Sequence, residues 1–411
     1  MNPPGTECNP GYLKLELTAR GMRLDKGVRA QADRNEAADD EPCQSVELVL
    51  PDGVSVNAPI ADGIESDSSY VLSGHGDHFT LQTNGTSVDV RVIPEPAFYR
   101  RTTSRGLSMR RVGHVYGSFI AINPGFACGY GLRGAPCRFC RNGSGVPVGE
   151  GFPMSIADVA EVVRAALAEG VVDFVYFNLA YVGSEDAGIA FLEPYIRAVK
   201  RQFNTLVAVQ VHPPKTDRWI DRTYAMGVDA VGYSVEIHDA EMLSRHCAGR
   251  VRYIGRERYY DALRYAATVF PSGTVWSDLV VGLEPADSTM RGIDVLTAAG
   301  VLPVLSTVRP SHDSASSGSR PPALDIVVPI YAHLFRTVRD ARINMGWIGD
   351  LSFAITPLEA RFFAGDDARL AVAMQQFHRT RIGSVTTRNL ARLRRRLRVR
   401  TVSDSFDSSH L

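Results

Sequence analysis

The sequence predicts an α/β fold: a partial (β/α)6 TIM-like barrel with a small β-rich N-terminal domain and a helical C-terminal extension. Two observations support this prediction. From Ser118 onward, short apolar runs typical of strands alternate with amphipathic runs typical of helices, as in βα units around a parallel sheet. Six such units are visible, so a partial barrel is favoured over a complete eight-fold one. A chain of 411 residues has room for a barrel-sized domain and an appendage.

The β-rich N-terminal domain is predicted to occupy residues 1–110. Ser45–Leu50 and Ser87–Ile93 alternate or run apolar like strands, and Asn84-Gly85 is a turn signal. The stretch Arg29–Glu41 is charged and Ala-rich with little apolar content, and we expect a mobile loop there.

The barrel is predicted to occupy residues 111–322. Its strands are predicted at Phe119–Asn123, Phe174–Leu179, Leu206–Val211, Ala230–Val235, Val275–Val281 and Leu302–Val308. Amphipathic helices are predicted between them at Ile156–Ala168, Glu193–Phe203, Asp217–Ala225, Arg256–Val269 and Thr289–Ala299.

The C-terminal extension is predicted to be helical over residues 323–402 and to begin with a long helix from about Ala323 to Arg342. The polar tail Ser403–Leu411 is predicted to be disordered. Within the extension, Arg388–Arg400 is strongly basic. Because the run has no interleaved aromatic residues, a solvated helix face or a partner contact is favoured over a nucleic-acid site.

Bulk composition narrows the class of protein. Lys plus Arg and Asp plus Glu balance at 45 each, so total charge does not steer the chain toward nucleic acid or membrane, and neither is expected as a partner. The N-terminus shows no signal peptide, and no apolar run is long enough to span a bilayer. We therefore expect a soluble cytoplasmic protein.

Three of the six cysteines lie in one Gly-rich loop: Cys128, Cys137 and Cys140. Three thiolates can hold three irons of a [4Fe–4S] cube and leave the fourth iron open to a small molecule, whereas four-cysteine clusters are closed. The alternative is a zinc site with a fourth ligand such as His114. Structural zinc sites usually combine two Cys-x2-Cys knuckles or add correctly spaced histidines, and only one knuckle is present, so iron is favoured.

With these residues, the chain resembles the radical S-adenosylmethionine (SAM) superfamily. The pair Cys137-Arg-Phe-Cys140 matches the last part of the superfamily's Cys-x3-Cys-x2-Cys motif, although eight residues replace the usual three in the first gap. Further similarity lies in Tyr181–Asp186, in Ser234-Val-Glu236 and the stretch from there to Tyr259, and in Trp276–Glu284. Ala248 and Arg250 stand where the family has Pro and Lys.

The resemblance implies that a [4Fe–4S] cluster held by Cys128, Cys137 and Cys140 cleaves SAM reductively to a 5′-deoxyadenosyl radical, which abstracts hydrogen from a small-molecule substrate. A one-electron donor such as flavodoxin or ferredoxin is implied as a partner. The chain has neither an auxiliary-cluster cysteine tail nor a cobalamin motif, so peptide-modifying and B12-dependent branches are disfavoured. The alternative is a zinc-stabilised binding or scaffold protein without catalysis.

The resemblance also implies site residues at the carboxyl ends of the strands, where barrel enzymes place their active sites. Glu185 and Glu236 are predicted to accept hydrogen bonds from SAM, and Arg250 or Arg256 to pair with its carboxylate. The full set predicted to contact the cofactor is Phe139, Gly183, Ser184, Glu185, Ser234, Glu236, Arg250, Arg256 and Gly282. Strand ends not used by SAM are expected to contact substrate through Tyr181, His212, Asp278, Arg309 and His312.

Overall fold

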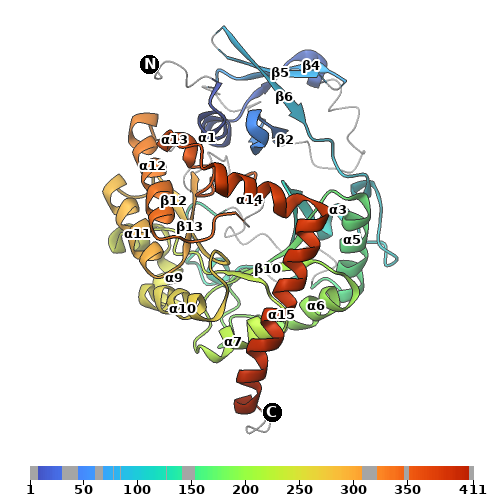
Figure 1. Ribbon diagram of the computed structural model, residues 1–411, viewed down its shortest axis with the longest axis vertical. Coiled ribbons are helices and arrows are strands. Elements are labelled where there is room, and N and C mark those ends of the chain that lie inside the picture. Colours follow the sequence, from blue (N-terminus) through green and yellow to red (C-terminus); the bar gives the residue numbers. More distant parts are fainter. Residues whose placement is uncertain are drawn as a thin grey trace.

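Six parallel strands in sequential order form the wall of a barrel in the computed structural model (Figure 1). The structure describes residues 8–29, 45–60, 68–76, 78–83, 85–125, 127–140, 153–307, 322–346 and 351–406. The parallel strands are β8 (Phe119–Ile122), β9 (Phe174–Asn178), β10 (Leu206–Gln210), β11 (Ala230–Gly232), β12 (Val275–Val281) and β13 (Leu302–Thr307). A short strand, β7 (His114–Tyr116), pairs antiparallel with β8 and ends the sheet.

Helices between the strands cover the outside of this sheet (Figure 1). They are α5 (Ile156–Glu169), α6 (Ile189–Gln202), α7 (Arg218–Ala225), α10 (Arg256–Val269) and α11 (Ala286–Ala298). The predicted bounds of β12 and α10 are confirmed, whereas α6 and α11 begin earlier than predicted. Two short helices between β11 and α10, α8 (Ala240–His246) and α9 (Ala248–Tyr253), were not predicted.

Alternation along the strands separates an apolar outer face from a polar inner face. On β9, Val175 and Phe177 belong to the main core together with residues of the covering helices. The alternating residues Tyr176 and Asn178 are only half-buried. Because successive strand side chains point to opposite faces, this second set lines the barrel interior. The fold therefore exposes polar groups to the interior while its apolar core lies between sheet and helices.

One C-terminal segment covers the gap between the first and last strands. Ile355 exchanges two backbone hydrogen bonds with Leu305 on β13, of 2.8 and 3.1 Å. Two residues earlier, the ring of Phe353 lies 5.7 Å from that of Tyr116 on β7 and 6.1 Å from that of Phe119 on β8. The segment thus satisfies backbone groups of an edge strand and bridges to the other side of the sheet.

The N-terminal unit is a six-stranded sheet with its own apolar core. Its strands, in sheet order, are β1 (Arg23–Leu24), β4 (Val71–His75), β5 (His78–Thr83), β6 (Thr86–Val92), β2 (Ser45–Val49) and β3 (Ser55–Pro59). The segments η3 (Ala97–Arg100) and α3 (Met109–Val112) that follow pack against α5. The predicted mobile loop falls largely outside the described residues.

Helix α1 (Pro10–Arg20), which was not predicted, joins the two cores. Leu13 and Leu17 pack in the core of the N-terminal sheet, whereas Leu15 belongs to the main core. Lys14 between them is fully buried and donates to Glu359 at 2.6 Å and to the carbonyl of Leu351 at 2.7 Å. Only one narrow face, with Tyr12, Glu16 and Arg20, is partly exposed, and a charged lysine lies on a buried face, so the amphipathic pattern is weak and did not reveal this helix.

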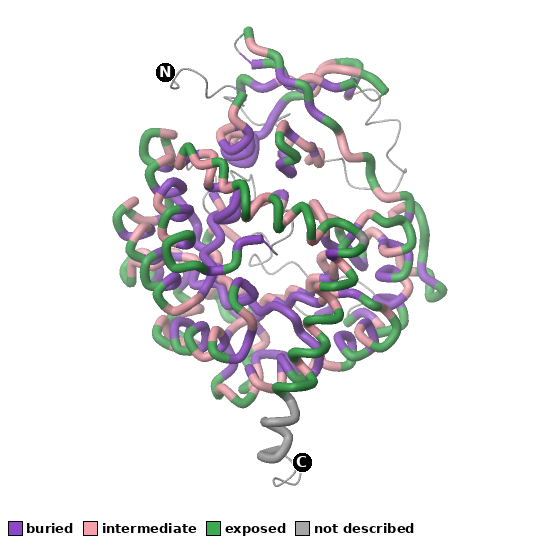
Figure 2. The backbone as a smooth tube through the Cα atoms, viewed as in Figure 1, coloured by how far each residue is buried: buried purple, intermediate pink, exposed green. Residues whose placement is uncertain are grey.

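The C-terminal extension contains α12 (Leu324–Asp340), α13 (Arg361–Ala364), α14 (Arg369–Arg379) and α15 (Arg381–Phe406). The predicted long first helix corresponds to α12. Helix α15 continues past the predicted start of the tail, and residues 407–411 lie outside the described residues. Figure 2 shows α14 and much of α15 exposed along their length. Within the described part of the chain, every helix is too short or too polar to cross a membrane.

Replacing Glu359 with Ala is expected to lower the free energy of unfolding by about 3–5 kcal/mol, because the buried Lys14 ammonium loses its carboxylate. Urea unfolding measures the change. Asp367→Ala, which removes the partner of the largely exposed Arg369, is the matched control and should leave stability unchanged. Equal stability of the Glu359 variant and the parent would contradict a structural role for this ion pair.

Candidate functional site

The cysteine loop lies at the carboxyl ends of the barrel strands. It follows β8, and Cys128 immediately precedes the short helix α4 (Gly129–Leu132). The amide of Gly129 donates to the carbonyl of Tyr181, which follows β9, at 2.8 Å. The amide of Arg138 donates to the carbonyl of His246, at the end of α8, at 2.9 Å. The loop is thereby tied to two other strand–helix connections on this side of the barrel.

All three loop thiols belong to one cluster of packed side chains, which also contains the unpredicted neighbour Cys247. Hydrogen bonds from Cys247 and Arg250 lower the pKa of the buried Cys137 thiol to about 6 and favour its thiolate. The pKa of Cys247 is raised by its contact with Cys137 and by burial, so the shared proton stays on Cys247. Three cysteines, one already disposed to ionise, are a donor set that fits an iron–sulfur cluster.

The zinc alternative named His114 as a fourth ligand. In the described part of the chain, no group of three or more His, Cys, Asp or Glu side chains, the loop cysteines included, is arranged to hold one metal ion. The ring of His114, the suggested fourth ligand, contacts the rings of Tyr99 and Tyr116 at 6.2 and 6.3 Å. Burial lowers the pKa of His114, so this imidazole is neutral.

An aromatic stack holds the loop in place. Tyr130 on α4 stacks on Tyr181 with ring centroids 4.0 Å apart and planes inclined by 11°. The Arg133 guanidinium lies 5.7 Å from the Tyr181 ring and 5.4 Å from the Tyr253 ring, which permits cation–π attraction. At Gly249 a β-carbon would lie 2.8 Å from the Tyr130 ring, so only glycine permits this approach of α9 to the loop. Sequence reasoning missed Tyr130 and Tyr253.

An acid–arginine pair lies beside Cys137. The Arg250 guanidinium donates to the Glu236 carboxylate at 2.7 Å and to the carbonyl of Ser234 at 2.5 Å. Burial raises the pKa of Glu236 to about 7, against the opposing attraction of Arg250. Glu236 also has a φ of 68°, an uncommon backbone angle for a residue other than glycine. Both residues were predicted as SAM contacts, and the structure places them against a predicted cluster ligand.

A polar network on the inner wall continues from this pair. The Gln210 amide donates to the Ser234 hydroxyl and to the Asp278 carboxylate, both at 2.5 Å, and Ser234 also donates to Asp278. Tyr176 donates to the Gln210 carbonyl oxygen, and Asn178 donates to the same atom at 3.3 Å. Burial raises the pKa of Asp278. Ser234 and Asp278 were predicted, but Tyr176, Asn178 and Gln210 were missed, although strand alternation places them on the inner face.

His212 lies next to this network in a neutral, hydrogen-bonded state. Its Nδ1 is 2.7 Å from the hydroxyl of Tyr259, and the Tyr130 hydroxyl is 3.4 Å away. Burial, reinforced by the nearby charge of Arg250, lowers the pKa of His212 well below its usual value. The imidazole therefore contributes one donor and one acceptor nitrogen rather than a positive charge.

The other predicted residues that the structure describes form no hydrogen bond to this network. Glu185 pairs with Arg218 at 3.2 Å, and both side chains are exposed. Arg256 donates to the carbonyl of His238 at 3.0 Å and to Glu257 at 2.8 Å. Of the other residues predicted to contact the cofactor, Phe139 packs at the edge of the thiol cluster and Gly183 faces Arg133. The Ser184 hydroxyl accepts from the amide of Gly188, and Gly282 lies against Pro322. Their roles stay predictions, and Arg309 and His312 lie outside the described residues.

Comparison with known proteins gives one curated relative and several solved structures. A scan against protein-family models finds no match. The chain is 21% identical over 317 residues to bacteriochlorophyllide c C-7(1)-hydroxylase from Chlorobaculum limnaeum, an alignment that covers 67% of this chain and 78% of the relative.

Three solved structures are similar at low identity. Methylornithine synthase PylB has a TM-score of 0.44 and 12% identity, and the match covers 55% of this chain and 64% of that one. The FeFe-hydrogenase maturase HydG from Carboxydothermus hydrogenoformans has a TM-score of 0.42 and 14% identity, and the match covers 54% of this chain and 52% of that one. A radical SAM methyltransferase from Sphaerobacter thermophilus has a TM-score of 0.41 and 12% identity, and the match covers 78% of this chain and 80% of that one. This chain thus spans less than two thirds of the first two. At TM-scores below 0.5 these likenesses are too loose to bear on function.

The fold and the cysteine loop define the class: an enzyme with its site at the carboxyl ends of a partial barrel. These features agree with the resemblance to the radical SAM superfamily found in the sequence, and the curated relative, at 21% identity, is a hydroxylase. Enzymes of that superfamily use a [4Fe–4S] cluster and SAM as cofactors.

Replacing Cys128, Cys137 or Cys140 with Ala is expected to reduce bound iron from about four atoms per chain to near zero after anaerobic reconstitution. Iron and sulfide analysis measures the loss. Cys247→Ala is the matched control, because it removes a thiol that contacts Cys137 but lies outside the loop. Loss of iron in the Cys247 variant to the same extent would instead indicate a closed four-cysteine site.

The stability contributed by Glu236 is expected to depend on pH. Its pKa of about 7 exceeds the ordinary value of 4.5, so the folded state binds the proton more tightly than the unfolded chain. The resulting stability is present below pH 4.5 and is lost as pH rises through 7. Urea unfolding of iron-free protein measures the effect. As pH rises from 5 to 8.5, the free energy of unfolding of Glu236→Gln should increase relative to that of the parent, by at most about 3 kcal/mol. A pH-independent difference would contradict this assignment.

Proposed function

We propose that this enzyme holds a [4Fe–4S] cluster on Cys128, Cys137 and Cys140, binds SAM at the open iron, and abstracts a hydrogen atom from a small-molecule substrate. The bound cluster and SAM together supply the electron and the primary carbon radical for that abstraction. One observation carries the proposal: the three thiols of a single loop gather in one cluster, with Cys137 directly beside the buried Glu236–Arg250 pair.

Arg250 has the charge and the position to organise this site. Its guanidinium presents several donors in a fixed plane, which suits a carboxylate such as that of SAM. Glu236 and the carbonyl of Ser234 already accept from Arg250, which orients the guanidinium. The same cation offsets the negative charge of thiolates at the loop. We assign Arg250 to the SAM carboxylate and Glu236 to the SAM ammonium or ribose.

The inner-wall network is suited to binding a polar part of the substrate or of SAM. Gln210 is held by Tyr176, Ser234 and Asp278, so its amide has a defined direction before any ligand arrives. Preorganised polar groups bind a ligand without a large ordering cost. We assign Asp278 and the neutral His212 to substrate contacts, with Tyr181 forming an aromatic wall beside the loop.

The finer features of the function are also proposals. We propose that the substrate is a metabolite or a biosynthetic intermediate, and that a flavodoxin- or ferredoxin-type protein in the cytoplasm supplies the electron. The curated relative is named for hydroxylation of bacteriochlorophyllide c, which makes tetrapyrroles a reasonable first class of compound to test on this chain. Residues 1–110 are proposed as an appendage to the barrel of residues 111–322.

Anaerobically reconstituted enzyme with dithionite and SAM is expected to form 5′-deoxyadenosine and methionine in equal amounts. Liquid chromatography with mass spectrometry measures both products. Cys137→Ala should form neither, because the cluster is lost. Arg250→Ala should keep its iron but form at least tenfold less product at low SAM, while Arg218→Ala, which removes an exposed cation, should match the parent. A fully iron-loaded parent that leaves SAM intact would refute the proposal.

A further inference from the structure

The C-terminal helices α14 and α15 carry a concentrated positive charge in an otherwise neutral chain. Residues 369–400 contain ten arginines and no Asp or Glu, whereas the whole chain has 45 basic and 45 acidic residues. Such an asymmetry, hidden in the total charge, is typical of a segment that meets an anionic surface. The proposed hydrogen-abstraction chemistry makes no use of this segment.

Helix α15 attaches to the barrel through arginines. Arg395 donates to Asp229 at 2.7 Å and to the carbonyl of Val228 at 2.8 Å, and Arg392 donates to Asn204 at 2.6 Å. Arg398 donates to the carbonyl of Thr268. These acceptors precede β10, β11 and β12, so α15 lies across the amino-terminal end of the barrel, away from the cysteine loop. Figure 1 shows α14 and α15 together on one face of the molecule.

The outward face of the same helices is apolar. Along α15, Thr386 and the exposed leucines Leu390 and Leu393 follow one another at spacings of three or four residues, and Ile382 precedes them by one turn. Leu397, also exposed, lies at the edge of this face, beside the barrel. Residues so spaced share a helix face, and this face lies opposite Arg392 and Arg395. Exposed apolar residues on α14 have the same spacing and are Leu370, Met374 and Phe377. The usual arrangement, with apolar residues inward and charges outward, is therefore reversed.

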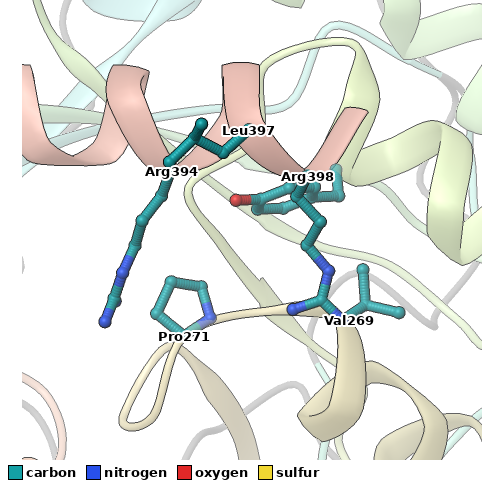
Figure 3. Close-up of a pocket in the computed structure, with 6 residues that line it drawn as sticks. Val269, Pro271, Arg394, Leu397 and Arg398 are labelled. Atoms are coloured by element: carbon teal, nitrogen blue, oxygen red, sulfur yellow. The ribbon is translucent and has the colours of Figure 1, made fainter. Parts of the chain in front are cut away.

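A cavity beside α15 combines the two kinds of side chain. It has a volume of about 410 Å³ and is lined by Tyr224, Val269, Pro271, Arg394, Leu397 and Arg398. Figure 3 shows Arg394 and Arg398 descending from the helix past Pro271 and Val269. An apolar lining with two guanidinium groups suits a molecule that has an anionic head and a hydrocarbon part.

We propose that α14 and α15 form an interfacial surface that docks the protein on an anionic lipid bilayer. The leucine stripe would enter the headgroup–acyl boundary while flanking arginines pair with lipid phosphates. The combination of arginines and leucines favours a lipid bilayer over a second copy of the chain or a nucleic acid. A second copy would bring arginines against arginines without a carboxylate, and a nucleic acid would leave the apolar stripe without a partner. The earlier expectation of no membrane partner rested on total charge and on spanning segments, which do not bear on an interfacial helix.

Co-sedimentation of the full-length, cluster-loaded enzyme with vesicles tests the proposal. Binding to phosphatidylcholine vesicles containing 30% phosphatidylglycerol is expected to be at least tenfold tighter than to pure phosphatidylcholine, and to weaken with salt. The variant Ile382→Ser, Leu390→Ser, Leu393→Ser should bind at least tenfold more weakly. The double variant Arg394→Glu, Arg396→Glu should also bind the anionic vesicles at least tenfold more weakly. The matched control is Val295→Ser, Ile326→Ser, which removes exposed apolar side chains from α11 and α12 and should bind like the parent.

Iron content and 5′-deoxyadenosine formation, both unchanged from the parent, establish that each variant is folded and keep this test separate from that of the proposed function. The proposal is overturned if the parent does not bind anionic vesicles, or binds them no more tightly than pure phosphatidylcholine. It is also overturned if the Ile382→Ser, Leu390→Ser, Leu393→Ser variant binds anionic vesicles as tightly as the parent. A dimer that these changes dissociate, without vesicle binding, would overturn it as well. Binding to DNA that depends on the arginines and not on the leucines, in the absence of vesicle binding, would assign the surface to nucleic acid instead.

Discussion

The site depends on one buried cation, the guanidinium of Arg250. It contacts Glu236, the carbonyl of Ser234 and Cys137, and it lies 5.5 Å from the ring of Tyr259. Taking a charge out of water costs several kcal/mol, and only well-placed partners offset that cost. Here the partners are supplied by three separate segments: the end of β11, the cysteine loop and α10. Each segment is held in place because the others satisfy the same cation, so the carboxyl end of the barrel is organised around one residue.

The backbone near Arg250 departs from regular structure at Glu236. Strand β11 ends at Gly232, and Glu236 pairs only by an isolated bridge to Leu279 with its φ at 68°. Such strain persists only when surrounding contacts enforce it, here the hydrogen bonds of Glu236 to the backbone of Asp278 and Val280. At Gly232 a β-carbon would lie 2.3 Å from the Trp276 indole, so the glycine lets this large ring turn into the barrel.

Strand positions were predictable from the sequence because they depend on local apolar runs, and β12 and α10 have the predicted bounds. Helix α1 was not, since it is buried between two cores and contains the buried charge of Lys14. Among site residues, strand ends were predictable but side-chain directions were not: Glu236 turns toward Cys137, whereas Glu185 turns outward to Arg218. The partners of Asp278 come from β10 and from the segment after β11, and no linear motif connects residues that only the fold brings together.

Charged side chains are arranged differently at the two ends of the barrel. At the carboxyl end, charges are buried and paired, which fixes directions but leaves little freedom to move. At the amino end, arginines fasten α15 to carbonyls and to Asp229, and leucines are left in water. Polar residues at those outward positions would keep the same anchoring contacts and avoid exposing an apolar stripe, so anchoring alone does not account for the leucines. The outward leucines of α15, a helix held to the barrel by its arginines, are explained if this face contacts a lipid bilayer rather than water.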